Sequence, residues 1–158
     1  MLKKLYLTQV WVLVAGSLFA WYTVYVDFAR FYGIEGTLLK IKDCAVPNPV
    51  VTPCFYGAIA FILALAWSIK IYKSAADQQI ICEKKLRWLL VASVLFAWGN
   101  FVYIFTKFYQ AGFNPTAGCS GVVTTSPFLT PCFFGMLFFI LALIIAIIII
   151  VKHNKTNG

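Results

Sequence analysis

Four uninterrupted apolar runs constrain the fold of this chain more than any other feature. They cover roughly residues 6–26, 55–69, 88–106 and 133–151. With the polar or proline residues that flank them, each run reaches the length of about 20 residues that a helix needs to cross a bilayer. Because lipid offers no partners to backbone N–H and C=O groups, runs of this length span a membrane only as helices. We therefore expect an all-α integral membrane protein with four transmembrane helices.

Composition agrees with this class. The chain has 158 residues, of which 62% are hydrophobic and 11% are charged, and this excludes an ordinary soluble globular protein. The length corresponds to a single membrane domain over residues 1–158. The net charge of +8 does not indicate a nucleic-acid partner, because no polar segment carries a basic stripe with interleaved stacking aromatics. The partner we expect is the lipid bilayer, whose anionic headgroups attract such charge.

The positions of lysine and arginine predict the orientation. Nine lie at the termini and near the central loop around residues 73–86, whereas four lie at the opposite helix ends. Cytoplasmic segments are enriched in these residues, so we expect cytoplasmic termini and two long outer loops in a plasma or inner membrane. The first run follows two lysines, as in a signal peptide. We interpret it as a retained helix because it lacks a small-x-small cleavage site and recurs as the third run.

The second half of the chain repeats the first. The segment TPCFYG at 52–57 returns as TPCFFG at 130–135, and an offset of 77 superimposes the first and third runs. Matches at that offset include Trp11 with Trp88, Phe19 with Phe96, Ala20 with Ala97, and Trp21 with Trp98. Chance is a poor explanation for this many matches. Residues 6–73 and 86–151 are thus expected to form two tandem helical hairpins related by a pseudo-two-fold axis along the membrane normal.

Each Thr-Pro-Cys motif is predicted to begin a helix. Threonine suits the N-cap and proline the first helical position. Cys54 or Cys132 then lies in the first turn, where the positive end of the helix dipole favours a thiolate. The same position therefore suits either an inert half-cystine or a reactive thiol.

Cysteine placement leaves structural and redox interpretations open. Two cysteines are expected in each outer loop, where disulfides persist, and Cys82 is expected as a cytoplasmic thiol or a palmitoylation site. Of the three pairings possible for four outer cysteines, the repeat favours Cys44 with Cys54 and Cys119 with Cys132. Each bridge would then close its own loop and contribute about 2–3 kcal/mol in the loop-entropy model. We expect no metal site, because the one histidine is predicted to be cytoplasmic.

Two resemblances bear on the redox alternative. Four helices with two cysteines in each outer loop resemble the layout of the bacterial disulfide-bond-forming membrane oxidases and of the vitamin K epoxide reductases. This resemblance implies electron transfer from a protein thiol to a quinone, which those families perform through a Cys-x-x-Cys pair; this chain contains none. The Thr-Pro-Cys motifs at 52–54 and 130–132 are similar to the Pro-Cys motifs of membrane electron carriers that supply periplasmic thioredoxin-like proteins. Those carriers have more helices.

Polar and aromatic residues within the runs suggest a pocket. Thr23 and Asn100 occupy equivalent positions, so they either hydrogen-bond between helices or line a small polar pocket on the pseudo-axis. Trp21 and Trp98 lie among other aromatics at the outer ends, where they anchor the helices at the interface or contact a flat hydrophobic ligand. Glu83 is assigned to the inner loop. With no charged residue expected in mid-span, an ion-coupled pump is disfavoured.

Small residues predict close helix packing. Gly16-x-x-x-Ala20 and Ser93-x-x-x-Ala97 are equivalent small-xxx-small patterns. Such patterns let helix backbones approach each other, either within one chain or across a homodimer interface.

Function remains open between classes. The preferred interpretation is a non-enzymatic accessory or binding component for a hydrophobic ligand or a membrane protein partner, with disulfide-stapled outer loops and no cofactor. The alternative is a quinone-linked thiol–disulfide oxidoreductase, with Cys54, Cys132, Cys44 and Cys119 as its redox cysteines. Small-solute transport is a third class, indicated only by the pseudo-symmetry. The lack of Cys-x-x-Cys and of buried charge favours the first.

Overall fold

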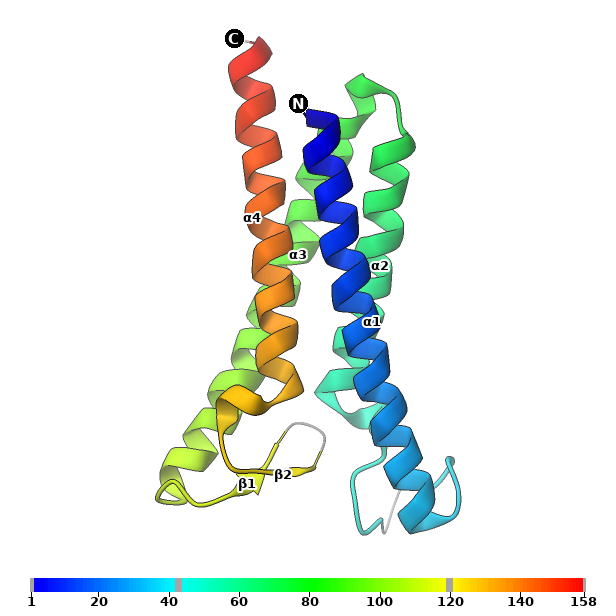
Figure 1. The fold of residues 1–158 in the computed structure, drawn as a ribbon, viewed down its shortest axis with the longest axis vertical. Helices are drawn as coiled ribbons and strands as arrows, with labels where there is room; N and C mark the ends of the chain where they lie inside the picture. The colour runs from blue at the N-terminus through cyan, green and yellow to red at the C-terminus, as the bar shows by residue number, and fades with distance from the viewer. Residues whose placement is uncertain (1, 42–43, 119–120, 158) are drawn as a thin grey trace.

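Four long helices dominate the structure, a computed structural model that describes residues 2–41, 44–118 and 121–157 (Figure 1). They are α1 (Leu2–Glu35), α2 (Pro53–Lys73), α3 (Ala76–Gln110) and α4 (Pro131–Asn157). Within the described ranges these four are the helices long and apolar enough to cross a membrane. The expected all-α class and the expected number of such helices are therefore confirmed.

The helices form an up-down-up-down bundle. α1 packs against α2 and α4, and α3 packs against the same two helices, while α2 and α4 also touch across the diagonal. Both termini and the short α2–α3 turn lie at one end of the bundle, which we call the terminal end (Figure 1). The opposite end carries the described loop residues 36–41, 44–52, 111–118 and 121–130, and we call it the loop end.

Short elements order the two loops. The first contains the 3-10 helix η1 (Pro49–Val51), directly before α2. The second contains the strands β1 (Thr116–Ala117) and β2 (Val123–Thr124), paired antiparallel, and then the 3-10 helix η2 (Pro127–Leu129). Each loop thus reaches its Thr-Pro-Cys motif through one turn of 3-10 helix that begins with proline.

Two helices are longer than the apolar runs predict. α1 continues to Glu35, and α3 begins at Ala76 instead of near residue 86. The segment 78–85 is polar, but its Gln, Glu and Lys residues are good helix formers. In place of the expected inner loop, the structure has a short turn at Ser74 and Ala75. This corrects the placement of Glu83, which lies inside α3 and is fully buried.

Aromatic rings and small residues fill the centre of the bundle. The rings of Phe61 and Phe139 stack at 3.8 Å with planes 10° apart. Gly16 faces Phe61, and a Cβ added at Gly16 would lie 2.4 Å from that ring. The small residue at position 16 therefore serves contact between α1 and α2 inside the chain.

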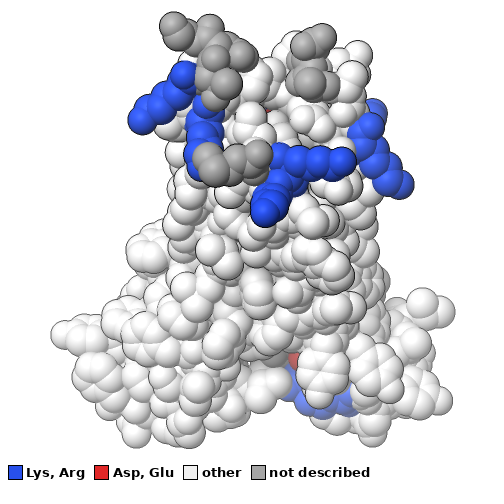
Figure 2. Space-filling view, turned by 45° about the horizontal axis from the view of Figure 1, so that its top comes forward, with Lys and Arg blue, Asp and Glu red and all other residues white. Residues whose placement is uncertain are grey.

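The lateral surface of the bundle between its two ends, which we call the girth, is apolar and exposed. Trp11, Leu18, Trp88 and Leu95, two pairs of repeat equivalents, are each about two-thirds exposed (65%, 69%, 66% and 65%). On the face drawn in Figure 2, lysine and arginine side chains surround the terminal end, and a smaller group lies near the loop end. Large exposed apolar surface between two charged ends is the pattern of a bilayer-facing bundle.

Candidate functional site

Both Thr-Pro-Cys motifs begin their helices in the same way. Thr52 and Thr130 are extended residues at the N-cap positions, and Pro53 and Pro131 are the first helical residues, as predicted. The threonine hydroxyls do not cap the helix, however. They donate backwards, to the carbonyl of Pro49 at 2.7 Å and of Pro127 at 2.6 Å. Each hydroxyl thus ties the first residue of the 3-10 turn to the residue that precedes the helix.

The two motif cysteines meet between the first turns of α2 and α4, toward the loop end of the bundle. The Sγ atoms of Cys54 and Cys132 lie 4.0 Å apart, and both side chains are half-buried. A disulfide bond measures about 2.05 Å, so the two sulfurs are in contact and are not bonded to each other. The contact arises because α2 and α4 begin at the same end of the bundle and touch across the diagonal.

The predicted Cys44–Cys54 disulfide is wrong for this structure. Among the described residues, these two cysteines are not joined. Cys44 directs its sulfur to the Lys40 carbonyl at 3.4 Å within its own loop, whereas Cys54 points toward Cys132. The prediction for Cys119 lies outside the described residues.

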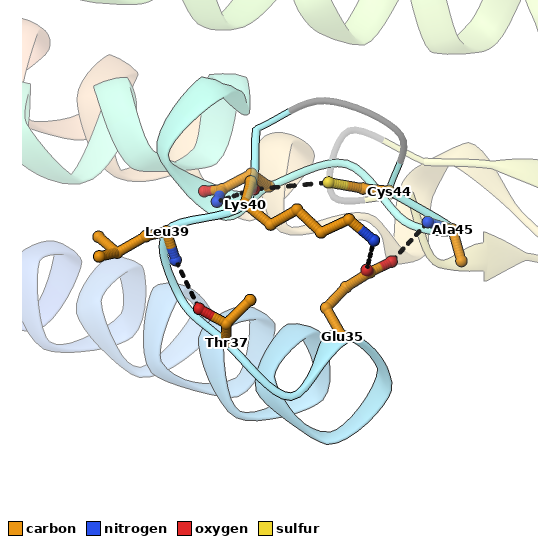
Figure 3. Close-up of polar contacts among 7 residues, drawn as sticks. Glu35, Thr37, Leu39, Lys40, Cys44 and Ala45 are labelled. Carbon is orange, nitrogen blue, oxygen red and sulfur yellow. Dashed lines mark hydrogen bonds and ion pairs between the residues drawn. The ribbon is translucent and has the colours of Figure 1, made fainter.

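Polar contacts close the first loop. The Glu35 carboxylate at the end of α1 accepts hydrogen bonds from Lys40 Nζ at 2.6 Å and from the Ala45 N–H at 2.5 Å (Figure 3). The buried Asn48 side chain donates to the carbonyls of Leu38 and Lys40, at 3.1 and 2.8 Å. The hydrogen bond to Glu35 raises the pKa of Lys40.

A small cavity of about 50 Å³ lies beside the two sulfurs. Every residue that lines it, except Ala58, has its repeat counterpart in the same lining. The pairs are Phe19 with Phe96, Ala20 with Ala97, Thr23 with Asn100, Pro53 with Pro131, Cys54 with Cys132, Gly57 with Gly135, and Phe61 with Phe139. This volume is enough for a few water molecules.

Thr23 and Asn100 line this cavity, but their donors stay within their own helices. The Thr23 hydroxyl donates to the Phe19 carbonyl at 3.0 Å, and the Asn100 amide donates to the Phe96 carbonyl at 2.8 Å. The sequence offers a hydrogen bond between helices as one alternative. In the structure, each side chain instead donates to the carbonyl four residues earlier in its own helix. Thr23 and Asn100 are the two polar residues besides the cysteines among the residues that line this cavity.

Trp21 and Trp98 lie at the surface and are not among the lining residues. Trp21 is 38% exposed and meets the ring of Phe55 edge-on at 6.4 Å. Trp98 is 50% exposed and lies 6.3 Å from the ring of Phe101. The structure therefore places the tryptophans on the girth, outside the cysteine cavity.

A larger chamber of about 440 Å³ lies at the loop end. It shares Pro53 and Asn100 with the cysteine cavity, and both loops contribute to its wall. Tyr103 and Lys107 of α3 also line it, with Lys107 Nζ 4.5 Å from the centre of the Tyr103 ring. The chamber is thus large enough for an organic ligand and adjoins the cysteine cavity through the two residues that they share.

The loops touch each other beside this chamber. Gly121 has a φ of 75°, which favours glycine. A Cβ at this position would also lie 2.8 Å from the ring of Pro47 in the first loop. A side chain at Gly121 would therefore push the two loops apart.

Asp27 distinguishes the two cysteines. It is 4% exposed, its Oδ1 lies 3.8 Å from Nη2 of Arg30, and its charge acts on Cys54. The repeat equivalent of Asp27 is Ile104, so Cys132 has no matching carboxylate at that position. Nothing in the sequence pattern relates Asp27 to a cysteine.

Comparison with protein-family models, with curated proteins and with solved structures finds no match to this chain. A four-helix bundle hosts many unrelated functions. The function must therefore follow from the cysteine pair, its cavity and the adjoining chamber.

Proposed function

We propose that the chain is an integral membrane protein with cytoplasmic termini and with the loop end outside. The length of the helices, the exposed apolar girth and the bias of nine basic residues to four support this proposal. An impermeant thiol reagent applied to intact cells should leave Cys82 unlabelled. Labelling of Cys82 before the cells are permeabilised would contradict this orientation.

Within that membrane protein, the site is best suited to thiol–disulfide exchange. The observation that carries this proposal is the 4.0 Å separation of the Cys54 and Cys132 sulfurs. The first turns of α2 and α4 bring these atoms within reach of each other. A purely structural staple would not require the adjoining chamber through which a reactant can approach.

The exchange step assigns different roles to the two cysteines. In the proposed oxidised state the second hairpin carries the disulfide between Cys119 and Cys132 that the sequence repeat favours, and Cys54 is the attacking thiol. The acceptor that we propose for its proton is the buried Asp27 carboxylate. The sulfur of Cys54 bonds to that of Cys132, and the Cys119–Cys132 bond breaks. Cys119 leaves as a thiolate and takes up a proton, so the step moves a disulfide without net oxidation.

Net turnover needs a donor and an acceptor. A dithiol substrate loses two electrons and two protons to become a disulfide, and an acceptor of the quinone class gains them to become a quinol. The cysteine cavity of about 50 Å³ is too small for a quinone ring, but the chamber of about 440 Å³ has the size of an organic-ligand pocket. Asn100, Tyr103 and Lys107 would provide its polar contacts.

A second candidate function is binding without turnover. The stacked Phe61 and Phe139 and the size of the chamber favour an apolar ligand or a membrane partner, with the cysteines serving only stability. The sequence alone favours this class. The approach of Cys54 to Cys132 makes the redox function the better explanation, because loop stapling does not need it.

The experiment is oxidation of a model dithiol by the purified protein with a soluble quinone analogue. Cys54→Ser and Cys132→Ser should each abolish turnover while the thermal unfolding transition is retained. Cys82→Ser, which alters a cysteine at the terminal end, should retain full turnover. Equal turnover in wild type, Cys54→Ser and Cys132→Ser would reject the redox function and leave the binding function.

A further inference from the structure

A second polar contact joins the two hairpins near the terminal end, far from the cysteines. Gln9 of α1 and Glu83 of α3 are both fully buried, and Gln9 Nε2 donates to Glu83 Oε1 at 2.7 Å. α1 and α3 lie on the second diagonal of the bundle. A glutamate removed from solvent this completely strongly favours the neutral acid unless a cation accompanies it.

Two acceptor atoms of this pair lack donors. Gln9 Oε1 and Glu83 Oε2 are buried and have no hydrogen-bond partner among the described residues. No ion pair to Glu83 occurs in that part of the chain either. An ionised Glu83 would therefore combine a buried charge with two unsatisfied acceptors, and each is costly.

We propose that the Gln9–Glu83 pair is a proton-binding site. A single proton on Glu83 Oε2, donated to Gln9 Oε1, satisfies both acceptors and neutralises the charge. The acid and the amide then form a closed ring of two hydrogen bonds, one in each direction. The bound species is a proton, and it links α1 to α3.

The surrounding groups allow this assignment. Tyr6 of α1 is the buried titratable group that faces Glu83, and its hydroxyl brings no positive charge. Its position is the repeat equivalent of Glu83. The other titratable groups of this end lie on exposed or half-buried surfaces: Lys3 and Lys4 on α1, Lys70, Tyr72 and Lys73 on α2, Cys82, Lys84, Lys85 and Arg87 on α3, and Lys152, His153 and Lys155 on α4.

The proton makes stability depend on pH in a defined direction. Below about pH 4, folded and unfolded chains both carry it, because a solvated glutamate titrates near that pH. At higher pH the unfolded chain releases the proton while the folded chain keeps it. The folding equilibrium constant then falls about tenfold per pH unit until the folded chain also releases the proton.

The test uses the whole protein in detergent micelles. We expect an infrared carbonyl band of a protonated carboxylic acid at neutral pH. This band should be absent in Glu83→Gln and present in Glu35→Gln, the matched control at the loop end. Raising the pH from 5 to 7 should lower the folding equilibrium constant of the wild type about a hundredfold relative to Glu83→Gln.

The opposite result would overturn the proposal. If the wild type shows no such band and its stability relative to Glu83→Gln does not change with pH, Glu83 is ionised and a cation or water satisfies it. Should Glu83→Gln fail to fold, the infrared pH titration of the wild type decides alone. A band that is lost on alkaline titration of the folded protein supports the proton, and the lack of any band rejects it.

Discussion

The two ends of the bundle join the same two hairpins by opposite means. At the loop end, Cys54 meets Cys132, its own repeat equivalent, across the α2–α4 diagonal. At the terminal end, Gln9 meets Glu83, and neither residue has kept its type in the other half, where Leu86 and Tyr6 occupy the equivalent positions. A contact between two identical residues suits cysteine, because two sulfurs can form a bond with each other. A donor–acceptor contact requires the halves to diverge.

Phenylalanine substitutions beside the loop-end cavity should have the largest effect on stability. Phe61→Ala and Phe139→Ala each remove one ring of a buried stack, and each should cost about 3–5 kcal/mol of unfolding free energy. Denaturant titration in micelles measures this loss. The exposed Leu95→Ala is the control and should stay within about 0.5 kcal/mol. Markedly unequal costs for Phe61→Ala and Phe139→Ala would show that the two equivalent rings do not contribute equally to stability.

Asp27 should make Cys54 and Cys132 differ in reactivity, because the carboxylate has no counterpart in the second half of the chain. If Asp27 accepts the Cys54 proton, Asp27→Asn should lower turnover by about 100-fold or more with the fold retained. The dependence of turnover on pH separates a base from a structural residue, because the asparagine variant should recover activity as alkaline pH ionises the thiol. An unchanged rate in Asp27→Asn would remove the base from the proposed step.

Disruption of the terminal-end pair should cost less than loss of a ring. Gln9→Leu leaves Glu83 without its donor and should destabilise the protein by about 1–3 kcal/mol. Adding Glu83→Leu to this variant should recover most of the loss, since two apolar groups leave nothing unsatisfied. A double variant whose cost equals the sum of both single costs would show that the two side chains are not coupled.

Gly16 and Ser93 occupy equivalent positions in the two halves, so alanine substitutions there compare how tightly the helices pack in each half. Gly16→Ala places a Cβ against the Phe61 ring and should cost about 1–3 kcal/mol. Ser93→Ala should cost less, because its hydroxyl donates only to the Leu89 carbonyl of the same helix, at 2.9 Å. Thermal unfolding of both variants provides the measurement. If Gly16→Ala is as stable as wild type, the approach of α1 to α2 does not depend on glycine.

The sequence predicts the helices and the start of α2 and α4, because apolar length and Thr-Pro signals act locally. It does not predict which cysteines meet. The pairing of Cys44 with Cys54 follows from proximity along the chain, whereas the contact of Cys54 with Cys132 follows from how two hairpins pack. Long-range packing of this kind leaves no local pattern in a single sequence.

The sequence also does not predict that Glu83 lies inside a helix. Its polar neighbours resemble a loop in composition, yet they are residues that extend a helix. Once α3 begins at Ala76, the helical period turns Glu83 inward toward Gln9. The residues that line the cavity can be partly predicted from the sequence, since the repeat continues through Gly57 and Phe61. Only the structure shows that these repeated residues face one another.

The most direct test of the pairing of Cys54 with Cys132 is a disulfide map of the Cys119→Ser variant, treated with a mild oxidant before the remaining thiols are blocked. Without the sulfur of Cys119 the starting disulfide cannot form and Cys132 remains a thiol, so the account predicts that the oxidant joins Cys132 to Cys54, whose sulfur lies 4.0 Å away. Cys44→Ser, treated in the same way, should not accumulate this bridge. A Cys119→Ser protein with Cys54 bonded to Cys44 and with Cys132 recovered as a blocked thiol would contradict the account.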